Sequence, residues 1–396
     1  MLGVTGGIAA YKSIQLARDL TRLGAVVDVV LTAAAQKFVA PLSFEGLTGR
    51  RVLTDLFSVD GSALHIRLGQ ETDVVCVAPA TADFLARAAE GRADDLLCTS
   101  LLATRASVVV CPAMNDRMFA HPQVQENVER LRTRPGYVIA GPAAGPLAAG
   151  EGEGPGRMLE PHCIVEHVGR ALGTDEAFRG RRVLVTAGPT QEAIDPVRYV
   201  GNRSSGRMGY ALAQAAWRRG ASVTLVSGPS QLEPPVGVEL VRVESAVEML
   251  EAVSDAIPQA DMSVFAAAVA DFRPATAERE KMKREASGNG FAVALAPNPD
   301  IAGETRGARK AGSVTVGFAL ETNDLVANAR KKLEKKGFDL LVANDVTEAG
   351  AGFEVDTNRV TILTADGDPE ALPLMSKDAV AEEILDRAAL RLPATD

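Results

Sequence analysis

Residues 2–12 read LGVTGGIAAYK, a short apolar run that passes through a hydroxyl and two glycines into a helical pattern. The run Leu2–Val4 predicts a strand, and the apolar spacing of residues 14–23 predicts the helix that follows. Thr5–Gly7 then places a hydroxyl and backbone N–H groups at a helix N-terminus, which suits a phosphate. A tight turn that needs glycine explains the same residues equally well. Because the full GxGxxG pattern is missing, a mononucleotide is favoured over a dinucleotide.

Short apolar strands alternate with amphipathic helices up to residue 172, and the pattern begins again at Arg182. Strands separated by helices pair in parallel and are covered on both faces, so we expect an α/β chain with two doubly wound three-layer domains. The expected strands are 2–4, 26–31, 74–78, 108–111 and 138–140, then 183–186, 223–227, 238–243, 263–267, 314–318 and 340–343. Further expected helices are 82–89, 95–103, 123–131 and 164–172, then 208–219, 246–257, 325–335 and 378–390.

A chain of 396 residues is too long for one ordinary core and suits two domains. We predict a first domain over 1–172, a polar linker without periodicity over 173–180, and a second domain over 181–396. The first strand is short at its N-terminal side, so we expect that the natural start lies upstream or that the chain has been trimmed.

The composition argues against several classes of protein. A net charge of -9 makes non-specific nucleic-acid binding unexpected. The apolar runs are broken before they reach a membrane-spanning length, and no signal sequence opens the chain. Four cysteines lie far apart without CxxC spacing, which favours neither a zinc site nor a disulfide framework. We therefore expect a cytoplasmic protein without a membrane or nucleic-acid partner.

Polar side chains follow the predicted strands of the first half. Thr32 follows the second strand, Thr81 the third and Asn115 the fourth. Because the carboxyl ends of the strands form the ligand crevice of a doubly wound sheet, we expect them to meet there with Thr5. The amide of Asn115 is able to bind a substrate carboxylate, and helix capping is the alternative. On its own, His65 reads as a half-buried surface histidine.

Three stretches of the first half, residues 3–12, 78–82 and 112–115, resemble the flavin-binding cysteine decarboxylase family. The resemblance implies a flavodoxin-like fold with FMN, which oxidises a cysteinyl thiol so that carbon dioxide leaves easily and then returns the electrons. It also implies that His65 is an active-site residue and that Asn115 binds the substrate carboxylate. The implied neighbours of FMN are Thr5, Gly6, Gly7, Thr32, Ala78, Thr81 and Ser100.

The glycine-rich stretch 141–158 suits a mobile lid over a pocket, and a plain flexible loop is the alternative. In the family this lid carries a cysteine before a glycine, and the cysteine protonates the last intermediate. Here Ala149 stands at that place, and alanine has no acid function. We expect decarboxylation to survive, with water or another group as the proton donor.

Small residues and hydroxyls also open a helix at residues 202–209, where a phosphate site and a helix cap are equally good explanations. The apolar run 266–270 ends in Asp271, and the cationic run 281–284 follows. Such a run is usually a solvated face, but beside an anion site it becomes a phosphate clamp. Lys332 and Lys336 share one helix face, and ordinary surface lysines are the alternative.

With these stretches the resemblance extends over nearly the whole chain, to the family of bifunctional phosphopantothenoylcysteine decarboxylase/phosphopantothenate–cysteine ligases. It implies a Rossmann-like second domain in which CTP and Mg²⁺ activate 4'-phosphopantothenate as an acyl-cytidylate, which the amine of cysteine then attacks. Asn202 would orient this intermediate, Lys281 would neutralise phosphate charge, and Arg198 and Arg203 would contact phosphopantothenate. The residues implied to bind CTP are Phe265, Ala266, Ala267, Asp271, Lys281, Asn298, Pro299, Asp300, Ile301, Phe318, Lys332 and Lys336.

Two other functions fit parts of this pattern. A regulatory binding protein with a catalytically dead flavin half would explain Ala149, although Asn115 and the ligase pattern argue against it. A generic flavin or nicotinamide oxidoreductase predicts bound NAD(P), but no GxGxxG follows a strand. The resemblance also implies a homo-oligomer, a dodecamer with trimeric packing of the flavin domains, dimeric packing of the ligase domains and the FMN site near a subunit interface.

Overall fold

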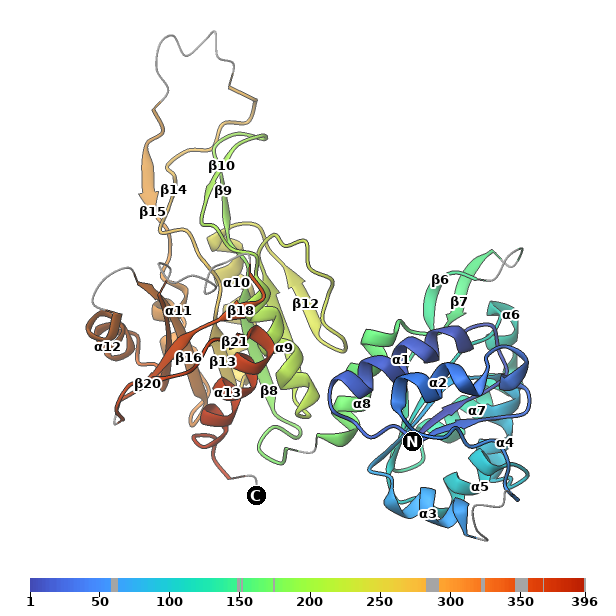
Figure 1. Ribbon diagram of the computed structural model, residues 1–396. Helices are drawn as coiled ribbons and strands as arrows, with labels where there is room; N and C mark the ends of the chain where they lie inside the picture. The colour runs from blue at the N-terminus through green and yellow to red at the C-terminus, as the bar shows by residue number, and fades with distance from the viewer. Residues whose placement is uncertain are drawn as a thin grey trace. The chain divides into compact units, whose positions relative to one another are not determined.

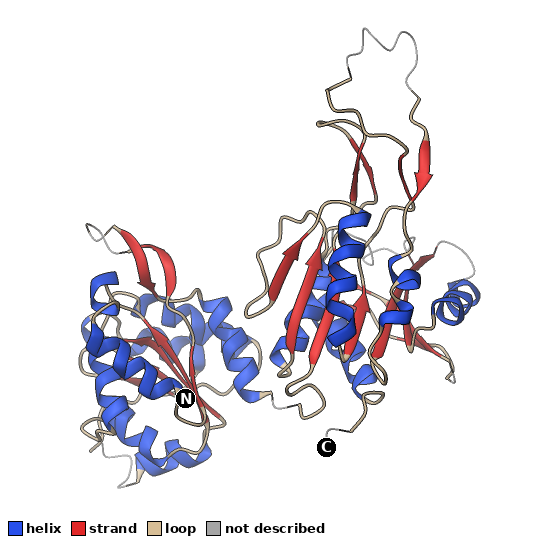
Figure 2. Cartoon of the chain, turned by 180° about the vertical axis from the view of Figure 1, so that it is seen from behind, coloured by secondary structure: helices blue, strands red, loops and turns tan. Residues whose placement is uncertain are grey.

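The computed structural model describes residues 1–57, 63–147, 150, 152–173, 175–282, 292–321, 325–345, 355–365 and 367–394 (Figure 1). The chain separates into two compact units, Met1–Gly173 and Thr174–Asp396. In each unit, helices cover both faces of a mainly parallel sheet (Figure 2). The expected α/β class is therefore confirmed.

The first unit is built on a parallel five-stranded sheet in the order β2-β1-β3-β4-β5. The order 2-1-3-4-5 is that of the flavodoxin-like doubly wound sheets, whose ligand crevice lies between the first and third strands. The strands are β1 (Leu2–Val4), β2 (Val29–Leu31), β3 (Val74–Ala80), β4 (Ser107–Pro112) and β5 (Tyr137–Ile139).

Apolar side chains on the two faces of this sheet form separate cores, each closed by its own helices. One face packs against α1 (Ala10–Arg22), α2 (Pro41–Thr48) and α8 (Pro161–Leu172). The other packs against α3 (Leu64–Glu71), α4 (Ala82–Glu90), α5 (Leu96–Ala103) and α7 (Pro122–Arg132). Shorter elements are η1 (Ala35–Lys37) and α6 (Asp116–Phe119).

Local chemistry fixes the helix ends nearest the carboxyl edge of this sheet. The Thr81 hydroxyl accepts a hydrogen bond from the Phe84 N–H and caps α4, and the Asp95 carboxylate caps α5 through the Cys98 N–H. Helix α4 ends at Gly91, whose φ of 74° is in the left-handed region that favours glycine. Strand-to-helix turns of defined geometry thus border the crevice.

Residues 141–158, expected to be a lid or a plain flexible loop, contain an antiparallel hairpin of β6 (Ala143–Pro146) and β7 (Glu153–Arg157). The loop alternative is therefore wrong for the described residues. Glycines leave no apolar alternation in this stretch, so no strand was predicted there. Ala149 lies outside the described residues.

The second unit contains an eight-stranded sheet in the order β12-β11-β8-β13-β16-β17-β19-β20. The first six strands run parallel in the Rossmann order, and β19 and β20 extend the edge antiparallel. The strands are β8 (Arg182–Ala187), β11 (Ser222–Ser227), β12 (Glu239–Arg242), β13 (Met262–Phe265), β16 (Val314–Glu321), β17 (Leu340–Asp345), β19 (Val360–Thr364) and β20 (Glu370–Ala371).

Helices α9 (Arg207–Arg218) and α13 (Lys377–Ala389) cover one face of this sheet, and α10 (Ala246–Ala256) and α12 (Leu325–Lys336) cover the other. Three small antiparallel pairs were not expected from the sequence. They are β9 (Gln191–Ala193) with β10 (Tyr199–Gly201), β14 (Phe272–Pro274) with β15 (Leu295–Pro297), and β18 (Thr357–Asn358) with β21 (Met375–Ser376). The remaining short helices are η2 (Ile257–Gln259), α11 (Ile301–Glu304) and η4 (Arg306–Ala308).

The strand expected over 263–267 ends at Phe265, and residues 266–271 leave the sheet. The Ala267 N–H donates to the Thr186 hydroxyl at 3.2 Å, and the Ala270 N–H donates to the Thr190 hydroxyl at 3.0 Å. Two hydroxyls, together with the Gly188 carbonyl that accepts from the Ala268 N–H at 2.8 Å, therefore hold this segment beside the turn that follows β8.

Candidate active sites

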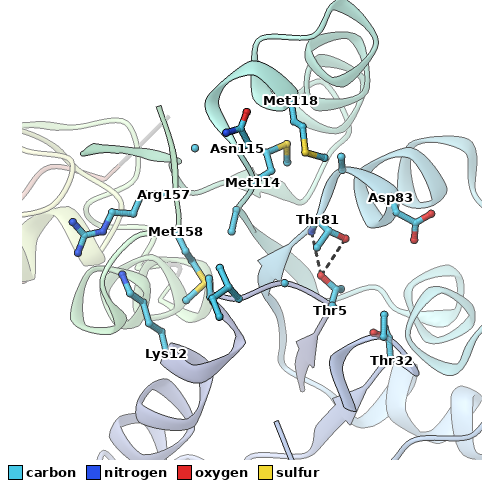
Figure 3. A pocket seen from close by; sticks show the side chains of 18 of the residues that line it. Thr5, Lys12, Thr32, Thr81, Asp83, Met114, Asn115, Met118, Arg157 and Met158 are labelled. Atoms are coloured by element: carbon cyan, nitrogen blue, oxygen red, sulfur yellow. Dashed lines mark hydrogen bonds between the residues drawn. The ribbon is translucent and has the colours of Figure 1, made fainter. Parts of the chain in front are cut away.

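A cavity of about 980 Å³ lies at the carboxyl edge of the first sheet (Figure 3). Its walls come from the turns that follow β1, β2, β3 and β4, together with the β6–β7 hairpin. Six residues expected at an FMN or substrate site line it, namely Thr5, Gly6, Gly7, Thr32, Thr81 and Asn115. The cavity thus occupies the crevice that the strand order predicts.

Threonine hydroxyls hold the turns of this cavity in place. Thr5 Oγ1 donates to the Pro79 carbonyl at 2.7 Å and accepts from the Thr81 N–H at 3.1 Å, so β1 and β3 are joined at their ends (Figure 3). Thr32 Oγ1 accepts from the Ala35 N–H at 3.2 Å. Among the described residues no side chain caps α1; the Ala10 and Lys12 N–H groups donate to the Gly7 and Ala9 carbonyls, and the residues at this helix start line the cavity. An anionic group is the natural partner of such a helix end.

Gly6 lies where two of these turns approach each other closely. A Cβ atom at this position would lie 2.4 Å from the Ala34 Cβ atom and 2.9 Å from the Ala34 carbonyl carbon. Any side chain would push the turn after β1 away from the turn after β2. Glycine is therefore required by space, in addition to any conformational reason.

The β6–β7 hairpin is tied directly to the segment that carries Asn115. The Met114 N–H donates to the Gly156 carbonyl at 2.9 Å, and a Cβ atom on Gly156 would lie 2.3 Å from the Met114 carbonyl oxygen. Arg157 and Met158 continue from the hairpin along the cavity wall (Figure 3). The hairpin thus forms a fixed side of the cavity at its base.

Lys12 lines the cavity and brings a positive charge to it, although Lys12 is only 8 % exposed. Its ammonium lies 2.8 Å from Glu160 Oε1, and the Arg157 guanidinium lies 2.5 Å from the same oxygen. The hydrogen bond from Lys12, and the charges of Lys12 and Arg157, hold the pKa of Glu160 below its ordinary value against the opposing effect of burial. One carboxylate therefore fixes two cations that border the cavity.

The ion pair predicts a pH dependence. Because the folded-state pKa of Glu160 is lowered, its stabilisation is fully present above the unfolded pKa of about 4.3 and is lost as the pH falls through the folded value. Because the Glu160 side chain is 41 % exposed and solvent screens the pair, the contribution is only about 0.5–1 kcal/mol. We expect α1 and α8 amides to exchange hydrogen about two- to fivefold faster in Glu160→Gln than in the unmodified protein at neutral pH. When the two proteins are compared at the same acidic pH, the difference in exchange rate should vanish. A difference that persists in acid would contradict the role given to the Glu160 ion pair.

Three predicted site residues of the first unit do not line the cavity of their own chain. Ala78 is fully buried within β3, where its carbonyl accepts from the Ser13 hydroxyl at 2.6 Å. Ser100 is fully buried in α5 and donates to the Leu96 carbonyl at 2.8 Å. His65 is half-buried on α3, a helix that packs against α5 on one face of the sheet. A family motif read along the sequence does not say which way each side chain faces.

Asn115 combines the two possibilities that its sequence position left open. Its Oδ1 atom accepts from the Arg117 N–H at 3.0 Å and caps the short helix α6. The residue also lines the cavity, beside Met114 and Met118 (Figure 3). The cap fixes one end of the amide group at the cavity rim, so its orientation is set before a ligand binds.

Two further cavities adjoin each other in the second unit. The larger, of about 530 Å³, is lined by residues 202–209 before and within α9, by the irregular segment after β13, and by the ends of β16 and β17. The smaller, of about 380 Å³, is bordered by residues 298–302 and the aromatic rings of Phe265 and Phe338. The residues common to both walls are Ala267, Val269, Asp271, Phe318 and Lys332.

Of the predicted CTP residues, all but Lys281 line one or both of these cavities. Lys332 Nζ donates to the Phe318 carbonyl at 2.8 Å, which holds the ammonium at the shared wall. Asn298 Nδ2 donates to the Ala270 carbonyl at 2.8 Å. Lys336 pairs with Asp300, and although burial acts to raise the pKa of Asp300, this hydrogen bond holds it below the ordinary value.

The residues predicted to act on phosphopantothenate divide between the cavity and its surroundings. Asn202 and Arg203 line the larger cavity, and Asn202 Nδ2 donates to the Val269 carbonyl at 2.8 Å. Arg198 does not line it, because its guanidinium pairs with Asp195 at 3.1 Å and donates to the Met282 carbonyl. Lys281 precedes Met282 and lines neither cavity, and residues 283–284 of the same cationic run lie outside the described residues.

Sequence reasoning missed several residues of the larger cavity. Asn344, Asn358 and Lys377 line it and belong to three different elements, whereas Arg207 lies within the stretch 202–209 that was considered as a phosphate site. The first three form no motif, and the pairing of β18 with β21 and the packing of α13 on α9 bring Asn358 and Lys377 to the cavity. The sequence offers one weak indication for Lys377, which is its position directly before the predicted helix 378–390.

In the described part of the chain, no cluster of three or more His, Cys, Asp or Glu side chains is arranged to hold a metal ion. No helix there is long and apolar enough to cross a membrane.

Comparisons with known proteins cover both units. Residues 1–173 match the family model described as Flavoprotein, and residues 178–391 match the model of the DNA/pantothenate metabolism flavoprotein C-terminal domain. The coenzyme A biosynthesis bifunctional protein CoaBC of Vibrio vulnificus is 47 % identical over 387 residues, which are 97 % of this chain and 96 % of that protein.

Two further relatives also match over nearly the whole chain. The CoaBC proteins of Bacillus subtilis and Escherichia coli are 45 % and 43 % identical over 394 residues each, and cover 98 % and 99 % of this chain and 96 % of their own length. Identity at this level over nearly the whole chain shows common descent of both units. The chain therefore belongs to the family of coenzyme A biosynthesis bifunctional proteins.

Proposed function

We propose that this chain catalyses two consecutive reactions of coenzyme A biosynthesis. The second unit ligates cysteine to 4'-phosphopantothenate with CTP, and the first unit decarboxylates the resulting phosphopantothenoylcysteine to 4'-phosphopantetheine with FMN. Two observations together support the proposal. The chain is similar to CoaBC proteins over nearly its whole length, and each of its two sheets has a cavity at its ligand crevice. We further propose that the enzyme works in the cytoplasm.

The residues of the first cavity fit FMN. Its volume of about 980 Å³ accommodates a mononucleotide, and the uncapped start of α1 with Thr5, Gly6 and Gly7 suits the phosphate. Thr32 and Thr81 add hydroxyls around the same end. When bound, FMN would supply reversible two-electron oxidation of the cysteinyl group.

The protein side chains would bind and orient the substrate. Asn115, whose amide is held by the cap of α6, would bind the substrate carboxylate, and Lys12 and Arg157 would attract the anionic substrate to the cavity. Replacement of a carboxylate by hydrogen takes up one proton, and Ala149 cannot provide it. Water or another group at the cavity would do so.

His65 is proposed to act across a subunit interface. It does not line the cavity of its own chain, and α3 is separate from the cavity wall. A homo-oligomer in which flavin units pack around their FMN sites would bring His65 of one copy to the cavity of the next. We propose the dodecameric arrangement, with trimers of flavin units and dimers of ligase units.

In the second unit, the nucleotide would span the two adjoining cavities. Phe265, Ile301 and Phe338 give the smaller cavity an apolar lining for the base, and Lys332 at the shared wall would meet the phosphates. Asn202 would hold the acyl-cytidylate in the larger cavity. Mg²⁺ would enter with the phosphates, as is usual for this ion, rather than in a protein cage.

Each half-reaction is tested by itself on purified protein. With FMN and phosphopantothenoylcysteine, we expect release of carbon dioxide and formation of 4'-phosphopantetheine in equal amounts. With 4'-phosphopantothenate, cysteine and Mg²⁺, we expect pyrophosphate release from CTP in preference to ATP, GTP or UTP. Absence of carbon dioxide would contradict the proposal for the first unit, and absence of pyrophosphate with CTP would contradict it for the second.

A further inference from the structure

A buried lysine near the C-terminal end of the chain lines the larger cavity in the second unit. Lys377 is the first residue of α13 and is 7 % exposed, yet it lines the cavity together with the residues that open α9. A lysine is rarely buried to this extent unless its charge is used or balanced. Lys377 therefore brings a largely buried positive charge to the wall of this cavity.

Backbone contacts fix the position of this side chain. The Lys377 N–H donates to the Asp356 carbonyl at 2.9 Å, and the ammonium donates to the Val355 carbonyl. The Ser376 hydroxyl accepts from the Ala379 N–H at 3.2 Å and caps α13. The ammonium is thus held at the cavity wall and pays little conformational entropy when an anion binds.

A second cation lies at the same wall. Arg207 is the first residue of α9, and it pairs with the exposed Asp356. Burial, and then the positive charge of Arg207, lower the pKa of Lys377 against the opposing charge of Asp356. The described lining of the cavity also includes Arg203 and Lys332 but only one acid, Asp271. This excess of positive charge favours an anionic ligand.

Strand β17 brings a buried polar atom without a described hydrogen-bond partner to the same cavity. Asn344 lines the cavity, and its Oδ1 atom is buried without a hydrogen-bond partner among the described residues. Buried polar atoms of this kind are rare unless water or a ligand satisfies them. A hydroxyl group or a magnesium-bound water of the ligand would donate to it. The observation is independent of the two cations and indicates that a ligand belongs at the same wall.

We propose that Lys377 and Arg207 hold the terminal phosphates of the nucleotide, the diphosphate that leaves when the substrate carboxylate is activated. The inference rests on the proposed ligase function. A nucleotide whose base lies in the smaller cavity passes Lys332 at the shared wall, so its terminal phosphates extend along the start of α9 toward Lys377. The helix N-terminus adds its own attraction for the same charge.

The reaction shows why the two cations matter there. A carboxylate oxygen of 4'-phosphopantothenate attacks the α-phosphorus, and the bond from that phosphorus to the oxygen that bridges to the β-phosphate breaks. Diphosphate leaves with the electron pair of this bond, and no proton is transferred. Negative charge therefore grows on the leaving diphosphate, where Lys377 and Arg207 stabilise it.

The test is calorimetric titration of the full-length protein with pyrophosphate in magnesium buffer and, separately, with CMP and 4'-phosphopantothenate. We expect Lys377→Met to weaken pyrophosphate binding about 10- to 100-fold, as loss of a charged hydrogen bond does, and to leave CMP binding unchanged. Lys377→Arg should restore most of the affinity because it keeps the charge. Pyrophosphate release from CTP should fall in kcat, with the KM for 4'-phosphopantothenate unchanged.

Lys310→Met is the matched control, because Lys310 pairs with Asp261 and lines neither cavity. Intact CMP binding shows that the Lys377 variant is folded. Unchanged pyrophosphate affinity in Lys377→Met, or weakened binding of 4'-phosphopantothenate alone, would overturn the inference. If the unmodified protein neither binds pyrophosphate nor releases it from CTP, the proposed ligase function itself fails.

Discussion

Gly6→Val is expected to yield a protein without bound flavin and with decarboxylase activity lowered by at least about 100-fold. The added Cβ atom would lie 2.4 Å from the Ala34 Cβ atom, so the turns after β1 and β2 must separate. Such overpacking costs about 1–3 kcal/mol locally, which displaces the turn without unfolding the unit. The flavin content of the purified protein, read from its visible absorption, measures the effect. Ligase activity should stay unchanged, since Gly6 belongs to the other unit.

Gly46→Val is the matched control for this substitution. Gly46 lies in α2 of the same unit, and a Cβ atom there meets no other atom within 4 Å. This variant should retain flavin and both activities. Full flavin content in Gly6→Val would show that the turns tolerate a side chain and that the close approach does not shape the FMN site.

Lys332→Met is expected to lower pyrophosphate release from CTP by about 100- to 1000-fold, the usual cost of removing a positioned donor from a developing charge. Lys332 is held at the wall shared by the two cavities through its 2.8 Å hydrogen bond to the Phe318 carbonyl. Methionine keeps most of the side-chain volume and removes the charge. Decarboxylation of added phosphopantothenoylcysteine should be unaffected.

Lys335 lies on the same helix, is exposed and lines neither cavity, so Lys335→Met tests whether loss of any charge from α12 is sufficient. We expect this variant to retain full ligase activity. Equal losses in the two variants would mean that α12 acts through its net charge or stability and not through the ammonium of Lys332.

The sequence was sufficient for the elements with strong periodicity. The strand at Leu2–Val4 has its predicted bounds, and the predicted central strands of both sheets are present with shifted ends. Most of the missed elements are short or rich in glycine and proline, and β19, with the sequence VTILT, is an exception. Helix α3 spans only eight residues, and the β6–β7 hairpin alternates glycine with other residues, so neither has a readable apolar period.

The candidate sites divide in the same way. Thr5, Thr32 and Thr81 line the first cavity because the topology of a parallel sheet places its strand ends together, and this can be read from the sequence. Side-chain direction cannot be read in this way: Ser100, which the resemblance places near FMN, is fully buried in α5 and does not line the cavity. Lys377 was missed for another reason, since the β18–β21 pair and the packing of α13 on α9 bring it to the start of α9.

The most direct test of the account supplies purified full-length protein and FMN with 4'-phosphopantothenate, cysteine, CTP and Mg²⁺, and follows pyrophosphate and organic products by mass spectrometry. We expect pyrophosphate together with 4'-phosphopantetheine, which would show that both units act in sequence and that Ala149 is tolerated. Failure to form pyrophosphate with any nucleotide, or accumulation of phosphopantothenoylcysteine without any carbon dioxide, would contradict it.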